Sequence, residues 1–85
     1  MDECARHDRT VRLLEARLDA LAVVSERAPR GERRVEREIV AAVAATRHAV
    51  ALEIISAREA DAIWAALARR HPNASWCRGG PRLAA

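Results

Sequence analysis

Two cysteines and two histidines have the clearest capacity for chemistry in this chain. Cys4 and His7 stand close together near the start, and His71 and Cys77 stand near the end. Together they would supply the two-cysteine, two-histidine ligand set of structural zinc. Structural zinc normally uses tightly spaced pairs in fixed turns, whereas the second pair falls at a helix end and in a segment rich in glycine and proline. We therefore expect no metal and no other cofactor, and we interpret Cys4 and His7 as the start of an apolar seam.

The nucleophile candidates are also explained by structure. Ser56 precedes Glu59 by three residues, the spacing of a capping box that begins a helix. His48 lies inside an apolar run, where a histidine with a polar partner is more common than a general base. Because no nucleophile stands beside a base, we expect a protein that is not an enzyme.

Charge leaves a nucleic-acid alternative open. All fifteen residues counted as Lys or Arg are arginine, which is typical of a GC-rich genome and favours a bacterial or phage source. Residues 69–85 contain four arginines and no acidic residue, whereas the body of the chain is close to neutral. A basic tail can contact phosphates. The candidate contacts are Arg69, Arg70, Arg78 and Arg82.

The spacing of apolar residues predicts helices over about 3–27, 32–55 and 57–71. The first follows an alternating 3–4 rhythm, with Leu13, Ala20 and Val24 as a second, weaker stripe. Residues 28–31, APRG, break the chain into a short loop, and Pro72 stops the third helix. We predict an all-α fold: an antiparallel helical hairpin and a shorter third helix in one domain, residues 1–71, followed by an irregular basic tail, residues 72–85.

The run from Ile39 to Ile55 is apolar on nearly every face, so it must be covered on several sides. A chain of 85 residues has little else to cover it with, so we expect a protein partner or a homo-oligomer, most simply a dimer that completes a bundle. The predicted function is a small protein-interaction or adaptor module, such as a regulatory or phage-encoded factor. The predicted contact residues are Val11, Leu14, Leu18, Leu21, Ile39, Val40, Val43, Val50, Leu52, Ile54 and Ile55.

Location follows from the same run and from the start of the chain. Arg47 and His48 interrupt the apolar run at its centre, which argues against a membrane span. The first residues lack the basic start and apolar core of a signal peptide. We therefore expect a cytoplasmic protein with reduced thiols and no membrane contact.

Overall fold

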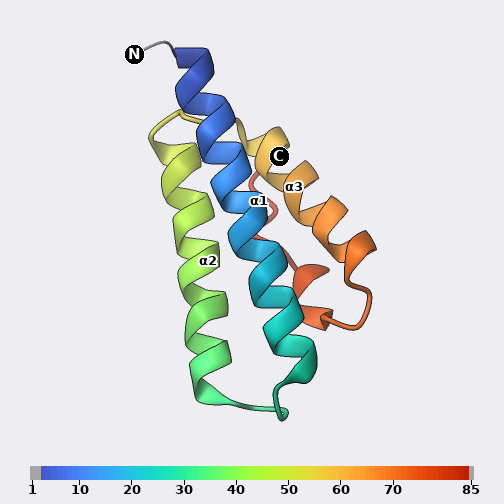
Figure 1. Ribbon diagram of the computed structural model, residues 1–85. Helices are drawn as coiled ribbons and strands as arrows, with labels where there is room; N and C mark the ends of the chain where they lie inside the picture. The colour runs from blue at the N-terminus through green and yellow to red at the C-terminus, as the bar shows by residue number, and fades with distance from the viewer. Residues whose placement is uncertain (1–2, 85) are drawn as a thin grey trace.

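The fold is an antiparallel helical hairpin with a shorter helix packed across it. The computed structural model describes residues 3–84, so the first two residues of the predicted domain and the last residue of the predicted tail lie outside the described range. Helices α1 (Glu3–Arg27), α2 (Arg33–Ala51) and α3 (Ala57–Arg70) are followed by the single 3₁₀ turn η1 (Ser75–Cys77), and there is no strand within 3–84. Figure 1 shows α1 and α2 side by side and antiparallel, with α3 beside α1. The predicted all-α class is confirmed.

The hairpin turn is made by the predicted loop. Gly31 has a φ of 76°, a left-handed conformation that costs glycine nothing because it has no Cβ. The amide of Glu32 donates to the carbonyl of Pro29 at 3.3 Å and closes the turn. The loop therefore reverses the chain within a few residues and makes α1 and α2 neighbours.

Helix α2 ends at Ala51 rather than at the predicted Ile55. Glu53 has a φ of 60°, and its amide donates to the carbonyl of Val50 at 3.0 Å. The amide of Ile54 reaches back to the carbonyl of Ala49 at 3.0 Å. These two bonds form a Schellman motif, which usually places glycine where Glu53 stands. The missing glycine is the reason that the sequence pattern does not mark this end.

Helix α3 begins at the predicted capping box. The Ser56 hydroxyl accepts from the amide of Glu59 at 3.0 Å, and the Glu59 carboxylate accepts from the amide of Ser56 at 3.0 Å. The two bonds satisfy amides at the helix start that have no partner within the helix. Helix α3 then ends at Arg70, just before Pro72.

The core lies where α3 crosses the hairpin. Its buried apolar residues are Leu14, Leu18, Leu21, Ala22, Ala42, Ile55, Ala60, Trp64, Leu67, Ala74 and Cys77. The buried polar residue of α2 is Thr46, whose hydroxyl donates to the carbonyl of Ala42 at 2.9 Å and accepts from Nε1 of Trp64 at 3.1 Å. The only large aromatic ring of the three helices is therefore fixed by a hydrogen bond as well as by packing.

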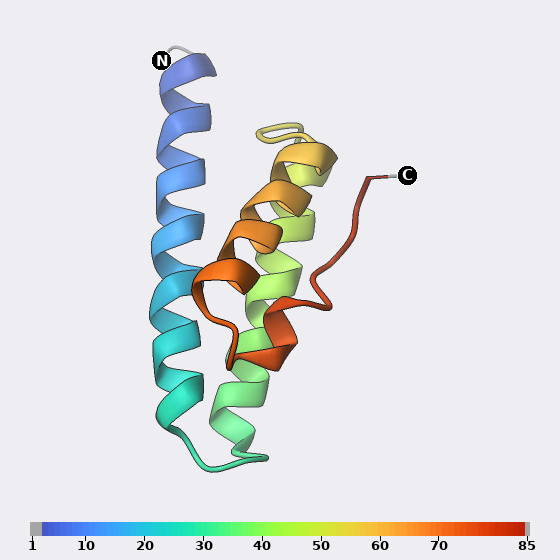
Figure 2. The ribbon, with the colours of Figure 1, turned by 90° about the vertical axis from the view of Figure 1, so that its right-hand side faces the viewer.

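The tail packs against this core even though most of it has no regular structure. Ala74 and Cys77 are buried, and Gly80 lies so close to Trp64 that a Cβ there would be 3.0 Å from the Trp64 Cβ. The Asp61 carboxylate accepts from the amides of Leu83 and Ala84, at 2.7 and 2.8 Å. Figure 2 shows the tail turning back alongside α3. The packed unit thus extends beyond residue 71.

Within residues 3–84, none of the helices is both long enough and apolar enough to cross a membrane.

Candidate functional site

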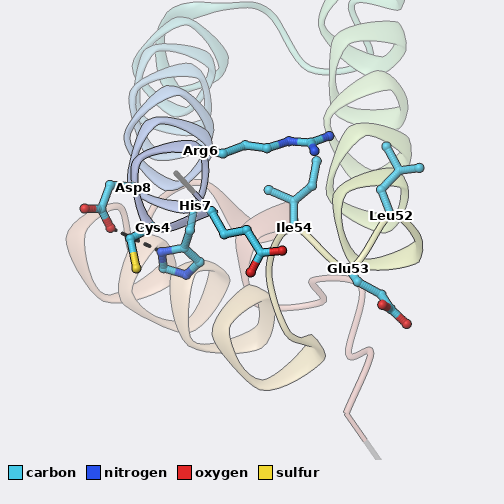
Figure 3. Close-up of a pocket in the computed structure, with 8 residues that line it drawn as sticks. Cys4, Arg6, His7, Asp8, Leu52, Glu53 and Ile54 are labelled. Atoms are coloured by element: carbon cyan, nitrogen blue, oxygen red, sulfur yellow. Dashed lines mark hydrogen bonds and ion pairs between the residues drawn. The ribbon is translucent and has the colours of Figure 1, made fainter. Parts of the chain in front are cut away.

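A cleft of about 550 Å³ lies between the first turns of α1 and the connection from α2 to α3 (Figure 3). Most of the residues that line this cleft are polar or charged. The lining residues are Glu3, Cys4, Arg6, His7, Asp8, Leu52, Glu53 and Ile54.

His7 is held by carboxylates on both sides of its ring. Nδ1 lies 3.2 Å from the Asp8 carboxylate, and Nε2 contacts the Glu59 carboxylate of the capping box. Carboxylates only accept, so both contacts are satisfied by the imidazolium, which donates from both nitrogens. The hydrogen bond with Glu59, and next that with Asp8, raises the pKa of His7 above its ordinary value. The backbone amide of Ser56, and next His7, lowers the pKa of Glu59.

This geometry makes His7 a tie between two helices. The Glu59 carboxylate accepts from the Ser56 amide with one oxygen and faces His7 with the other, so one side chain caps α3 and joins it to α1. A general base needs a ring nitrogen open to its substrate. Both nitrogens of His7 are engaged.

The four residues weighed as zinc ligands do not come together. His7 contacts the start of α3, whereas His71 follows its end, and a helix of that length separates them by roughly 18 Å. His71 faces two carboxylates of its own, with Nε2 2.9 Å from Asp19 and Nδ1 3.1 Å from Glu26. Within residues 3–84, there is no group of three or more His, Cys, Asp or Glu side chains placed to hold a metal ion. The expected lack of a metal stays a prediction.

Two side chains with nucleophilic atoms, Cys77 and Ser56, have structural roles instead. Cys77 is buried in the core, and burial, followed by the charges of Glu26 and Asp19, raises the pKa of its thiol to about 11. At neutral pH the Cys77 thiol is protonated, and the thiol is a far weaker nucleophile than the thiolate. Ser56 holds the capping box described above.

The predicted contact residues separate into three groups by exposure. Four lie in the core of the chain itself and are covered without any partner: Leu14, Leu18, Leu21 and Ile55. Five are partly buried against that core: Val11, Ile39, Val43, Val50 and Ile54. Val40 and Leu52 remain exposed, at 69% and 53%. The apolar run of α2 is covered on one side by α1 and α3, which the sequence alone does not reveal.

The four predicted phosphate contacts also differ from one another. The Arg70 guanidinium donates to the Asp19 carboxylate from both Nε and Nη2, and Arg78 donates from Nη2 to the carbonyl of Pro72 at 3.0 Å. Arg69 and Arg82 are exposed and have no such bond among the described residues. Half of the candidate set therefore has contacts within the chain.

The largest exposed aliphatic side chains of α1 are Leu13, Val23 and Val24, at 65%, 41% and 55% exposure. They lie on a face that we call the outer face of α1. Its exposed members, at the 3–4 spacing of one helix face and its margins, are Arg6, Arg9, Arg12, Leu13, Ala16, Arg17, Ala20, Val23, Val24 and Arg27. The second stripe of the sequence is part of this face, although the sequence does not indicate that it stays exposed when the first stripe is covered.

Acidic residues of α1 lie on a different side. Asp8 pairs with His7, Asp19 with Arg70 and His71, and Glu26 with His71. Asp19 and Glu26 thus pair with groups at the end of α3 and just after it, and the ten residues that define the outer face include five arginines and no acidic residue. No family model, curated protein or solved structure matches this chain, so its function has to be derived from its own surfaces.

Proposed function

We propose that this chain is a small, non-enzymatic protein-interaction module that works in the cytoplasm and binds its partner through exposed aliphatic side chains of the hairpin. The observation that carries the proposal is the exposure of five large aliphatic residues in so small a fold: Leu13, Val23, Val24, Val40 and Leu52.

These residues are exposed although the chain has a closed core. Leu18 and Leu67 are fully buried, and the tail covers the remaining side of Trp64. The exposed aliphatic residues are therefore not needed to complete the monomer. Three of the five, Leu13, Val23 and Val24, lie on α1 beside exposed arginines, and exposed apolar surface bordered by charged groups is typical of a site where another protein binds.

The alternative, a nucleic-acid-binding regulator that uses the basic tail, has less support. Arg70 and Arg78 are already hydrogen-bonded within the chain, and Asp61 lies in the same cleft as Arg78 and Arg82. A carboxylate beside the arginines weakens the attraction for phosphate. Catalysis has less support still, because His7 is tied on both sides and Cys77 is buried and protonated.

Site-specific photocrosslinking tests the proposal. A photoreactive phenylalanine derivative is placed at Leu13 in one variant and at Val40 in another, with Arg69 as the matched exposed control position, and cross-linking is carried out in extract. We expect a discrete protein adduct, identified by mass spectrometry, from Leu13, Val40 or both, and none from Arg69. Equal labelling at all three positions, or adducts to nucleic acid alone, would contradict the proposal.

A further inference from the structure

We propose that the outer face of α1 binds an acidic amphipathic helix of a different protein. This inference rests on the proposed function and deepens it, because it names which of the exposed aliphatic surfaces is used and what chemistry the partner must have.

The shape of the face suits a helix. From Arg6 to Arg27 it runs straight along α1 for about 32 Å, the length of a partner helix of about six turns. Leu13 and Val24 project from it, and Ala16 and Ala20 lie between them. Large side chains alternating with small ones let the side chains of a second helix enter the spaces between them. The face is open, since Figures 1 and 2 show α3 and the tail on another side of α1.

The charges of the face select an acidic partner. Five arginines lie on this face or at its margins, and of these Arg6 also lines the cleft beside the connection from α2 to α3: Arg6, Arg9, Arg12, Arg17 and Arg27. Asp8, Asp19 and Glu26 pair with His7, Arg70 and His71. The remaining described acidic residues of α1, Glu3 and Glu15, lie one turn from Arg6 and Arg12 at the margins of the face, so arginines outnumber carboxylates along it. A helix with glutamate or aspartate beside an apolar stripe would supply opposite charges along the whole length.

Other occupants fit less well. A second copy docked through the same face would place five arginines against five, and like charges across an interface are strongly unfavourable. A nucleic-acid backbone would pair with the arginines but leave Leu13 and Val24 uncovered. A membrane surface favours aromatic anchors, and α1 has none, since both tryptophans lie in α3 and the tail.

A designed peptide pair tests the inference with the whole chain. The acidic peptide has 21 residues, with leucine at 3–4 spacing and glutamate on its flanks. Its matched control, the lysine peptide, has lysine in place of every glutamate. Binding is measured by fluorescence anisotropy, together with binding of duplex DNA and of vesicles of phosphatidylserine and phosphatidylcholine. We expect the acidic peptide to bind at least tenfold more tightly than the lysine peptide.

Variants place the binding on the outer face. Leu13→Ser with Val24→Ser should weaken acidic-peptide binding at least tenfold, and Arg9→Gln with Arg17→Gln should weaken it severalfold. Val40→Ser on α2 is the matched aliphatic control and should leave it unchanged, with circular dichroism verifying that every variant is folded.

Several results would overturn the inference. One is equal binding of the lysine peptide, and another is tighter binding of DNA or vesicles than of the acidic peptide. The others are loss of acidic-peptide binding in Val40→Ser alone, and a dimer in light scattering that dissociates on Leu13→Ser with Val24→Ser. Photocrosslinking at Val40 with none at Leu13 would retain the proposed function and reject this deeper assignment. An absence of protein adducts at both positions would reject the proposed function itself.

Discussion

Replacing Thr46 by valine tests the buried polar contact at the centre of the core. Thr46 is fully buried, and its hydroxyl accepts from Nε1 of Trp64, a side chain that is only 2% exposed. Valine has the same shape, so the cavity does not change, but the indole N–H loses its acceptor. A buried donor left without a partner costs about 1–3 kcal/mol of unfolding free energy. For a domain of this size, each 1 kcal/mol corresponds to a fall in melting midpoint of about 4–8 °C.

A double-mutant cycle separates this hydrogen bond from packing. Urea unfolding followed by circular dichroism is measured for the wild type, Thr46→Val, Trp64→Phe and the double variant. With phenylalanine at position 64 no donor remains to be left without an acceptor, so Thr46→Val should then be close to neutral. The expected coupling is about 1 kcal/mol or more. If Thr46→Val costs the same in both backgrounds, or nothing in the wild type, the reasoning about the indole is refuted.

Four further predictions concern the helix end, the histidine tie, the tail and metal. Glu53→Gly should raise the unfolding free energy by about 1 kcal/mol, because the φ of 60° is strained for an L-residue; a lower midpoint in thermal melts would contradict this. The pKa of His7 is raised, so its stabilising contribution should be complete below the ordinary value of 6.5 and disappear as pH rises through the raised pKa. The pKa of Glu59, the capping carboxylate of α3, is lowered, so its contribution should be present above 4.5 and be lost as pH falls through the lowered pKa. The melting midpoint of His7→Gln, measured from pH 4 to 9, should therefore differ from wild type most between pH 4.5 and pH 6.5. The exposed control His48→Gln should show no such pH-dependent difference. Gly80→Ala should destabilise by about 1–3 kcal/mol through the 3.0 Å contact with the α3 indole side chain, whereas Gly79→Ala, with its nearest atom at 3.9 Å, should be neutral in the same urea titration. Excess chelator should leave helicity and melting midpoint unchanged, and stoichiometric zinc by elemental analysis would argue otherwise.

The parts of the fold that local chemistry specifies were predictable from the sequence. The bounds of α1, Glu3–Arg27, follow from its apolar rhythm and the break at residues 28–31. The start of α3 follows from Ser56 and Glu59, whose side chains satisfy the first amides. Each of these signals lies within a few residues of the feature that it determines.

Features that depend on distant contacts were not predictable in the same way. The end of α2 depends on a left-handed Glu53 instead of a glycine, and the order of the tail depends on Asp61, which lies more than twenty residues before the amides that it accepts from. The candidate surface is partly predictable, since the spacing of Leu13 and Val24 indicates a second apolar stripe on the first helix. Which stripe becomes core and which stays exposed depends on where α3 docks, and no periodicity encodes that.

The two tryptophans have a consequence for how the helices are aligned along their axes. Trp64 donates to Thr46 on α2, Trp76 donates to Ser25 on α1 at 2.9 Å, and the two rings meet edge to face with centroids 5.7 Å apart. A core of alanine, leucine and valine would tolerate sliding one helix past the other by a turn, about 5.4 Å, because one aliphatic contact is much like the next. Any such slip would separate an indole N–H from its hydroxyl. The hydrogen bonds of the two tryptophans therefore favour a single register of α1 against α2.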